Sequence, residues 1–325
     1  MKQFKNILCV IDKQVAEQHS LSRAVALAEE NQARVTVIMV IEPVRAAIGV
    51  SQELLSPHAL QEMLIDAQTK YLDTLIEPYK AHMEITARVL SGTPFLEIIR
   101  EVLRNAHDLV IKCPEAPDWL NRFFSGDDKH LLRKCPCPVW MVKPQSRENY
   151  RSILAAVDVD DSYPPGELKT REALNRMVME LAGSLAISEF AQLHVVHAWV
   201  AVAESALHYS VFMQQPENAV NTYVEQVRGH HAKLLERLMT EMGARLGKDA
   251  IEYIKPQLHM PKGLARKEIP ELARQLDVDC IVMGTVARTG IRGVIIGNTA
   301  ETILEQINCS VIAIKPPDFV TPVTF

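Results

Sequence analysis

The sequence predicts an α/β fold that occurs twice along one chain. Residues 5–12 form an apolar run that ends in Asp12, and residues 151–158 repeat this pattern and end in Asp158. After each run, segments with helical periodicity alternate with short apolar segments. Strands that are apolar throughout and alternate with helices form parallel sheets covered on both faces. We therefore predict two Rossmann-like domains, each with a five-stranded parallel sheet and helices on both faces.

The first domain is expected to span residues 1–146. Its strands are expected at residues 5–12, 34–41, 84–90, 108–112 and 138–144, where apolar and β-branched residues run together. Its helices are expected at residues 20–30, 61–81 and 94–106, where apolar residues recur every three or four positions. Gly92 marks the turn before the third helix.

The second domain is expected to span residues 147–325 with the same order of elements. Its strands are expected at residues 151–158, 192–199, 251–259, 279–283 and 310–316, and its helices at residues 171–186, 217–246, 265–276 and 300–307. The last strands of the two halves share the pattern Cys-(Pro/Ser)-Val-x-x-(Val/Ile)-Lys-Pro. We expect the domains to pack together through residues 138–143 and 310–315, because edge strands this apolar would otherwise aggregate. Further self-association stays open.

The composition argues against several classes of protein. The net charge is -5 and no long basic run is present, so we expect no nucleic acid partner. No apolar stretch reaches the roughly 20 residues that a membrane helix needs. The six cysteines are scattered, and some lie inside apolar strands, which is typical of a reduced cytoplasmic protein and not of a disulfide scaffold.

A glycine-rich segment at residues 284–299 lies between an expected strand and an expected helix. It contains Gly284, Gly290, Gly293 and Gly297. Backbone N–H groups of such a loop and the positive end of the helix dipole can both face an anion. In parallel sheets, ligands bind beyond the C-terminal ends of the strands, where this loop is expected to lie.

The order of these motifs resembles the universal stress protein family. The resemblance rests on Ile-Leu-x-x-(Val/Ile)-Asp at the start of each half, the late glycine loop and the Val-x-x-(Val/Ile)-Lys-Pro ending, and it covers nearly the whole chain. The duplication is most similar to the tandem, type E members. It implies an adenine nucleotide alpha hydrolase-like fold in each half. Nucleotide-binding members carry Gly-x2-Gly-x9-Gly-(Ser/Thr), and their first acid contacts ribose while the loop holds phosphates.

The resemblance implies a ligand site in the second half for ATP or another nucleotide-type ligand. Its residues are expected to be Asp158, Ala198, Gly284, Arg288, Gly290, Gly297, Asn298 and Thr299. Two positions depart from the family pattern, because Ala287 replaces the middle glycine and Asn298 replaces the Ser/Thr. A methyl group at Ala287 restricts the approach of backbone to phosphate, whereas the Asn298 amide can donate in place of a hydroxyl.

The first half matches the pattern only at Asp12 and Val40, which would form a second site. Its loop has lost nearly all glycines and carries Asp127 and Asp128. Carboxylates at the phosphate position would repel a nucleoside triphosphate, so we expect no phosphate binding there. The aromatic residues of this loop, Trp119, Phe123 and Phe124, are expected to pack against the protein itself.

Other candidate residues have plain structural interpretations. We expect His230 and His231 on the surface of a helix, because adjacent histidines point about 100° apart and do not form a metal pair. Cys135 and Cys137 flank a proline before a buried strand and are interpreted as structural. A set of residues, His197, Trp199, His208, Tyr209 and Phe212, forms either part of the core and a lid or an apolar extension of the ligand cleft.

The leading hypothesis is a non-enzymatic binding protein that holds a nucleotide-like, even amphiphilic nucleotide-linked, ligand in its second half and acts in the stress response. The sequence contains no nucleophile–base–acid set, no Walker motif and no paired carboxylates with a metal spacing. Two alternatives stay open, a weak ATP hydrolase and a protein-interaction scaffold whose site is vestigial.

Overall fold

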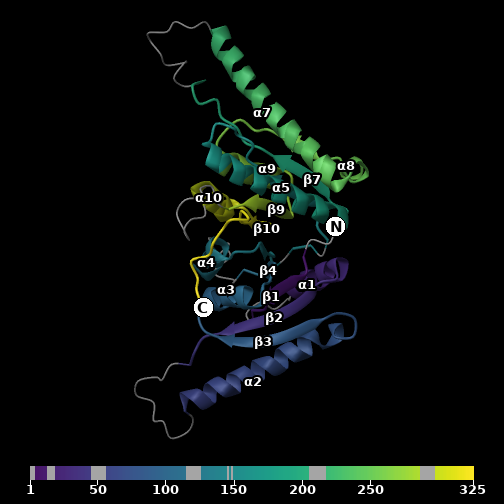
Figure 1. Cartoon of the computed structure of the whole chain (residues 1–325), viewed down its shortest axis with the longest axis vertical. Helices are drawn as coiled ribbons and strands as arrows, with labels where there is room; N and C mark the ends of the chain where they lie inside the picture. The colour runs from purple at the N-terminus through teal and green to yellow at the C-terminus, as the bar shows by residue number, and fades with distance from the viewer. Residues whose placement is uncertain are drawn as a thin grey trace.

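A ten-stranded sheet organises the part of the chain that the computed structural model describes, residues 4–12, 19–44, 56–114, 126–144, 146–147, 149–204, 217–285 and 297–325. The strands follow the order β3-β2-β1-β4-β5-β10-β9-β6-β7-β8. In Figure 1 they succeed one another along the long axis of the molecule. The first five strands in this order come from the first half of the chain and the other five from the second half.

The first half contains β1 (Asn6–Val10), β2 (Arg34–Ile41), β3 (Ile85–Ser91), β4 (Leu109–Lys112) and β5 (Val139–Met141). Its helices are α1 (His19–Asn31), α2 (Pro57–Ile76), the short 3-10 helix η1 (Glu77–Tyr79), α3 (Pro94–Asn105) and α4 (Gly126–Lys134). Neighbouring strands within this half are parallel. The helix α2 begins earlier than predicted, because the Ser56 side chain accepts the N–H of Ala59 and Pro57 suits the first helical position.

The second half contains β6 (Ser152–Ala156), β7 (Gln192–Val196), β8 (Gln257–His259), β9 (Cys280–Gly284) and β10 (Ser310–Ile314). Its helices are α5 (Pro165–Ser188), α7 (Glu217–Leu246), α8 (Lys248–Ile254), α9 (Ala265–Gln275) and α10 (Asn298–Gln306). Neighbouring strands are again parallel. The predicted pair of five-stranded parallel sheets is confirmed.

The expected strand at residues 251–259 is only partly correct. Ile251 and Ile254 belong to α8, and the strand β8 is limited to Gln257–His259. Lys255 adopts a left-handed conformation, with a φ of 46°, and its N–H donates to the carbonyl of Ile251. Ile251 and Ile254 lie about one helical turn apart, so the apolar pattern fits a short helix as well as a strand.

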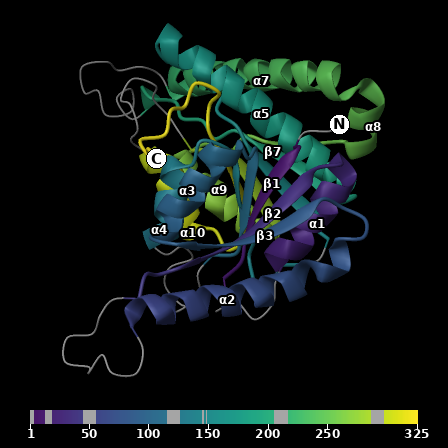
Figure 2. The same cartoon turned by 60° about the horizontal axis from the view of Figure 1, so that its bottom comes forward.

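Helices cover both faces of the sheet, as predicted. One face packs against α1, α2, α5 and α7, and the other packs against α3, α4, α9 and α10. Figure 2 shows α3, α4 and α10 on one side of the strands and α1 on the other. The central strands are almost completely buried, with all five residues of β1 and of β10 below a tenth exposed.

The two halves join through their last strands. β5 and β10 are antiparallel, with Trp140 opposite Ile312 and Val139 opposite Ala313. This confirms the predicted packing of residues 138–143 on residues 310–315. Because each half is parallel within itself, the antiparallel seam turns the halves in opposite directions. The C-terminal strand ends of the two halves therefore lie at opposite edges of the common sheet.

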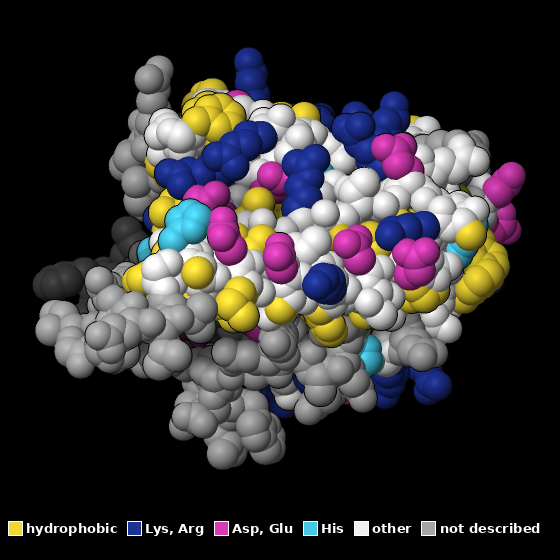
Figure 3. All heavy atoms as spheres, turned by 90° about the horizontal axis from the view of Figure 1, so that it is seen from below, with side chains coloured by type: hydrophobic (Ala, Val, Ile, Leu, Met, Phe, Trp, Pro, Cys, Tyr) yellow, Lys and Arg dark blue, Asp and Glu magenta, His cyan; other side chains and the backbone are white. Residues whose placement is uncertain are grey.

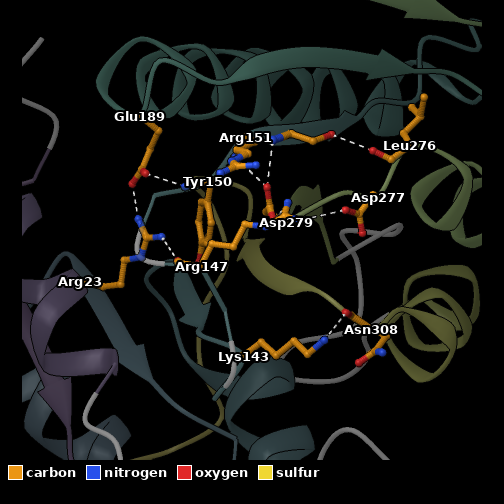
Figure 4. Close-up of polar contacts among 11 residues, drawn as sticks. Arg23, Lys143, Arg147, Tyr150, Arg151, Glu189, Leu276, Asp277, Asp279 and Asn308 are labelled. Carbon is orange, nitrogen blue, oxygen red and sulfur yellow. Dashed lines mark hydrogen bonds and ion pairs between the residues drawn. The ribbon is translucent and has the colours of Figure 1, made fainter.

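The segment that links the halves is held by side chains of both (Figure 4). Arg147 donates to Asp277 and to Asp279, each at 3.0 Å, and its carbonyl accepts Nη2 of Arg23 from α1. Arg23 also forms an ion pair with Glu189 at the end of α5. At the other end of the chain, the carbonyl of Thr324 accepts Nε of Arg100 in α3. The C-terminal tail thus returns to the first half.

The surface over α2 carries charges of both signs. Figure 3 shows the end of the molecule that α2 occupies, where Lys and Arg side chains alternate with Asp and Glu side chains, with hydrophobic side chains between them. Met63 and Leu64 are among the exposed hydrophobic residues of this helix. None of the helices in the described ranges is both long and apolar enough to cross a bilayer.

Candidate functional site

A cavity of about 320 Å³ lies at the C-terminal strand edge of the second half. It is bounded by the ends of β6 and β9, the segment after β7, residues 171–178 of α5 and the first turns of α10. Five residues predicted for the site line it, namely Asp158, Ala198, Gly284, Gly297 and Thr299. Residues distant in sequence meet here because parallel strands end at one edge of the sheet.

The other predicted residues of this half do not line the cavity or are not described. Asn298 begins α10, but its side chain is exposed and is not part of the cavity wall. Arg288 and Gly290 lie outside the described residues, as do His208, Tyr209 and Phe212. Their roles stay predictions.

The carboxylate of Asp158 is held by the protein itself. It forms an ion pair with Arg171 of α5, whose guanidinium carbon lies 3.5 Å from the centre of the Tyr163 ring. Burial raises the pKa of Tyr163 to about 12, and the Asp158 charge adds to this effect. Arg171 and Tyr163 both line the cavity, so this wall presents an arginine stacked on an aromatic ring.

Asn175 fixes the backbone at the end of β6. Its Oδ1 accepts the N–H of Asp158 at 3.0 Å, and its Nδ2 donates to the carbonyl of Asp158 at 2.7 Å. Neither Arg171 nor Asn175 was predicted for the site. Their spacing of i, i+4 at the start of an expected helix places both on one helix face, which is the signal that the sequence offered.

The ends of the glycine-rich segment are joined by a backbone hydrogen bond. The N–H of Gly297 donates to the carbonyl of Thr285 at 3.0 Å, and the N–H of Thr285 donates to the carbonyl of Ile314. The N-cap residue Gly297 has no side chain that could cap α10, so backbone amides of its first turn and the positive end of its dipole border the cavity. A methyl group at Gly284 would lie 3.3 Å from Leu174, which keeps this position small.

The prediction that His231 lies on the surface is wrong. Its side chain is buried, and its Nδ1 lies 3.0 Å from Nε2 of His197. Trp199 packs beside it, with ring centres 6.1 Å apart, and both rings line the cavity. His230 is exposed, as predicted, and bonds to Asp161. The long helix α7 turns one of its two adjacent histidines inward because adjacent residues point about 100° apart.

Comparison with known proteins assigns the chain to a family. The sequence model of the universal stress protein family matches residues 3–143 and again residues 149–315. The chain belongs to the universal stress protein family. It is 32% identical to Universal stress protein E of Escherichia coli (strain K12) over 329 residues, which covers 99% of this chain and 98% of that protein. It is 30% identical over 324 residues to a Universal stress protein E homolog of Haemophilus influenzae, which covers 96% of this chain and 98% of that protein.

Solved structures of universal stress proteins have the same architecture. A putative universal stress protein from Pseudomonas aeruginosa UCBPP-PA14 matches with a TM-score of 0.70 and 25% identity, over 98% of this chain and 95% of that one. A universal stress protein from Archaeoglobus fulgidus matches with a TM-score of 0.58 and 16% identity, over 96% of this chain and 99% of that one. These matches agree with the predicted tandem arrangement.

The first universal stress protein domain carries an ion pair at its corresponding strand edge. Nζ of Lys112, at the end of β4, lies 2.9 Å from Oδ1 of Asp128 in the first turn of α4, and both side chains are buried. Asp128 therefore faces a lysine inside the protein, where the sequence suggested a carboxylate facing a phosphate. As predicted, Asp12 follows the end of β1, and Val40 is the last residue but one of β2. Both residues are half-buried. Trp119, Phe123 and Phe124 lie outside the described residues.

The protein is expected to lose stability as the pH falls below about 6.5, the ordinary pKa of histidine. Burial lowers the pKa of His197, although Asp158 acts in the opposite direction, and burial also lowers the pKa of His194 and of His259. Above this pH these groups are neutral in both states. Below it the unfolded chain binds protons more tightly than the folded chain, which favours unfolding.

Thermal unfolding between about pH 5 and pH 8 measures this dependence. His197→Gln removes one of the three groups and should make the melting temperature fall less steeply with acid. His58→Gln, at an exposed histidine of α2, serves as the control and should keep the wild-type slope. Identical slopes for His197→Gln and the wild type would contradict the assignment.

Proposed function

We propose that this universal stress protein is a non-enzymatic binding protein of the stress response that holds a nucleotide-like ligand in its second half. The observation that carries the proposal is the cavity of about 320 Å³ at the C-terminal strand edge. A chamber at this edge, next to a helix N-terminus, is the usual place for a nucleotide in an open parallel sheet.

Different parts of the cavity suit different parts of such a ligand. The first turn of α10, with Gly297 and Thr299 on the wall, provides backbone N–H groups for a phosphate. Trp199 and Leu264 provide apolar surface, and Leu264 is half exposed at the rim. This apolar rim supports a ligand with a hydrophobic part, such as a nucleotide linked to an acyl chain, in addition to free ATP.

We propose a weaker ribose contact for Asp158 than the family pattern implies. Because its carboxylate already pairs with Arg171, a ribose hydroxyl would meet an acceptor whose charge is partly neutralised. The backbone of Ala198 remains the candidate for contacting the adenine base of the ligand. Loop residues Arg288 and Gly290 complete the proposed site from the residues outside the described ranges.

Thr299→Asp is expected to weaken ATP binding by at least about tenfold. The substitution places a carboxylate at the helix N-terminus beside the proposed phosphate position, where the first domain has Asp127. An aspartate in the first turn of a helix favours the helix itself, so the fold should be kept. Isothermal titration calorimetry of the full chain with ATP measures the change.

Thr302→Asp is the matched control, because it adds the same charge to α10 one turn further from the cavity. It should bind ATP more tightly than Thr299→Asp does. Equal weakening by both variants would point to a general charge effect and would count against the proposed site. Absence of binding by the wild type to ATP and to acyl-linked nucleotides would favour the scaffold alternative.

Phosphate release from ATP in the presence of Mg²⁺ tests the enzymatic alternative. We expect release at the rate of a buffer blank. Release above this background that Thr299→Asp abolishes would overturn the non-enzymatic proposal and favour a weak ATP hydrolase.

A further inference from the structure

Two cysteines lie side by side at the seam between the domains. Cys135 and Cys137 flank Pro136 between α4 and β5, and their sulfur atoms are 3.6 Å apart in hydrogen-bond contact. Cys135 is buried, whereas Cys137 is partly exposed. The contact means that one thiol proton can be shared between the two sulfurs, since either can be the donor.

A buried lysine lies beside this pair. Lys315 follows β10 and reaches across the seam, where its Nζ donates to the carbonyl of Leu132 in α4 and to Oγ1 of Thr285 at 2.5 Å. Burial lowers the pKa of Lys315 to about 8, and the charges of the two cysteines act in the opposite direction. The lysine and a thiolate therefore favour each other's charged form.

The electrostatics distinguish Cys135 from the remaining thiols. Burial opposes its thiolate, but the hydrogen bond from Cys137 and the charge of Lys315 outweigh this, so that the pKa of Cys135 lies below its ordinary value. Burial is the largest cause that raises the pKa of the thiols of Cys9, Cys113, Cys280 and Cys309. A thiolate is the reactive form of cysteine.

The duplication supplies an internal comparison. Cys309 occupies the position of Cys137 in the second half, and Lys143 occupies the position of Lys315. The position of Cys135 is taken by Ile307, which has no thiol. Cys309 is buried, and Nζ of Lys143 donates to the carbonyl of Asn308. The same local fold thus occurs once with a thiol pair and once with a single thiol.

We propose that Cys135 and Cys137 form a redox-active dithiol that a hydroperoxide converts to an intrachain disulfide. The shared proton shifts from Cys137 to Sγ of Cys135, and the partly exposed Cys137 then attacks the hydroperoxide as the thiolate. An S–O bond forms and the O–O bond breaks, and the leaving oxygen takes a proton and departs as an alcohol, or as water from hydrogen peroxide. Sγ of Cys135 then attacks the sulfenic sulfur, the S–S bond forms, and hydroxide leaves as water with the Cys135 proton.

This dithiol site does not depend on the proposed ligand cavity. It uses different residues and a different co-reactant, and its product is a covalent change that mass spectrometry can detect. A failure to bind nucleotides would leave it unaffected, and a failure to form the disulfide would leave the proposed function unaffected.

Hydrogen peroxide treatment of the full-length protein, followed by denaturation and thiol alkylation, tests the proposal. Mass spectrometry of the peptide 135–147 should find the loss of two hydrogen atoms and no alkyl group, whereas Cys309 should be alkylated fully. The Cys137→Ser variant should not form this product. Full alkylation of both Cys135 and Cys137 in the treated wild type would overturn the proposal, as would oxidation of Cys309 at the same rate.

Lys315→Met tests the electrostatic part, because methionine keeps an apolar stem and removes the charge. Disulfide formation should slow by roughly threefold to tenfold, since the thiolate fraction falls. Lys143→Met is the matched control at the duplicated position and should react at the wild-type rate. An unchanged rate for a folded Lys315→Met would remove the lysine from the proposal. The mass measurement on the wild type stands even if this variant fails to fold.

Discussion

Replacing Trp140 by alanine is expected to lower the free energy of unfolding by about 3 to 5 kcal/mol, as for other buried aromatic residues. Trp140 is 3% exposed and lies on β5, opposite Ile312 of β10, where the two domains meet. Its Nε1 donates to the hydroxyl of Tyr150 at 3.3 Å, and the guanidinium of Arg23 lies 5.9 Å from its ring. The truncation therefore opens a cavity at the only strand contact that joins the halves within the described sheet.

Urea unfolding followed by circular dichroism measures this loss, and Tyr150→Phe is the control. That variant removes the hydroxyl that accepts the Trp140 N–H but keeps the ring under Arg23, whose guanidinium lies 3.7 Å from the ring centre. It should cost only about 1 kcal/mol. A loss below about 1 kcal/mol for Trp140→Ala would mean that the seam adds little to stability.

The fold could be predicted from the sequence because its signals are local and repeated. Apolar runs that end in Asp12 and Asp158 indicated the first strand of each half, and the apolar character of residues 138–143 and 310–315 indicated a covered edge. The central strands, such as β1 and β10, are buried on both faces, so their apolar pattern can be recognised without knowledge of the neighbouring elements. The prediction of a strand over residues 251–259 was only partly correct, because an apolar run this short fits a helix as well as a strand.

The candidate site could be predicted only in part. Strand ends at Asp158 and Gly284 fall on the expected edge, since topology alone decides which residues meet there. The pairing of Asp158 with Arg171 and the burial of His231 depend on how α5 and α7 are rotated on the sheet. The apolar residues of these long helices do not mark one face sharply enough to fix that rotation.

The two copies use the same place in the fold in different ways. The last residue of β4, Lys112, pairs with Val10 of β1, just as Met283 of β9 pairs with Ala156 of β6. Asp128 and Ala300 are each the third residue of the following helix, α4 and α10, and both side chains are buried. One copy therefore fills this edge with an internal ion pair, and the other has a cavity there.

Lys112→Met is consequently expected to destabilise the protein by about 3 to 5 kcal/mol, because it leaves a buried carboxylate without its ammonium partner. Asp128 is 1% exposed, and its Oδ1 lies 2.9 Å from Nζ of Lys112. Urea unfolding of the full chain at neutral pH measures the change. Lys129→Met, at a partly exposed lysine of the same helix that pairs with Glu305, should change stability by less than about 1 kcal/mol.

The double substitution Lys112→Met and Asp128→Ala gives the first copy the residues of the second, Met283 and Ala300. It should be more stable than Lys112→Met alone by about 2 kcal/mol or more, because the buried carboxylate is then removed together with its ammonium partner. The difference between the double variant and the sum of the singles measures the coupling of the pair. Additive losses would mean that the ion pair contributes nothing specific. A double variant that is more stable than Lys112→Met alone would instead show that the two charges of the first domain depend on each other.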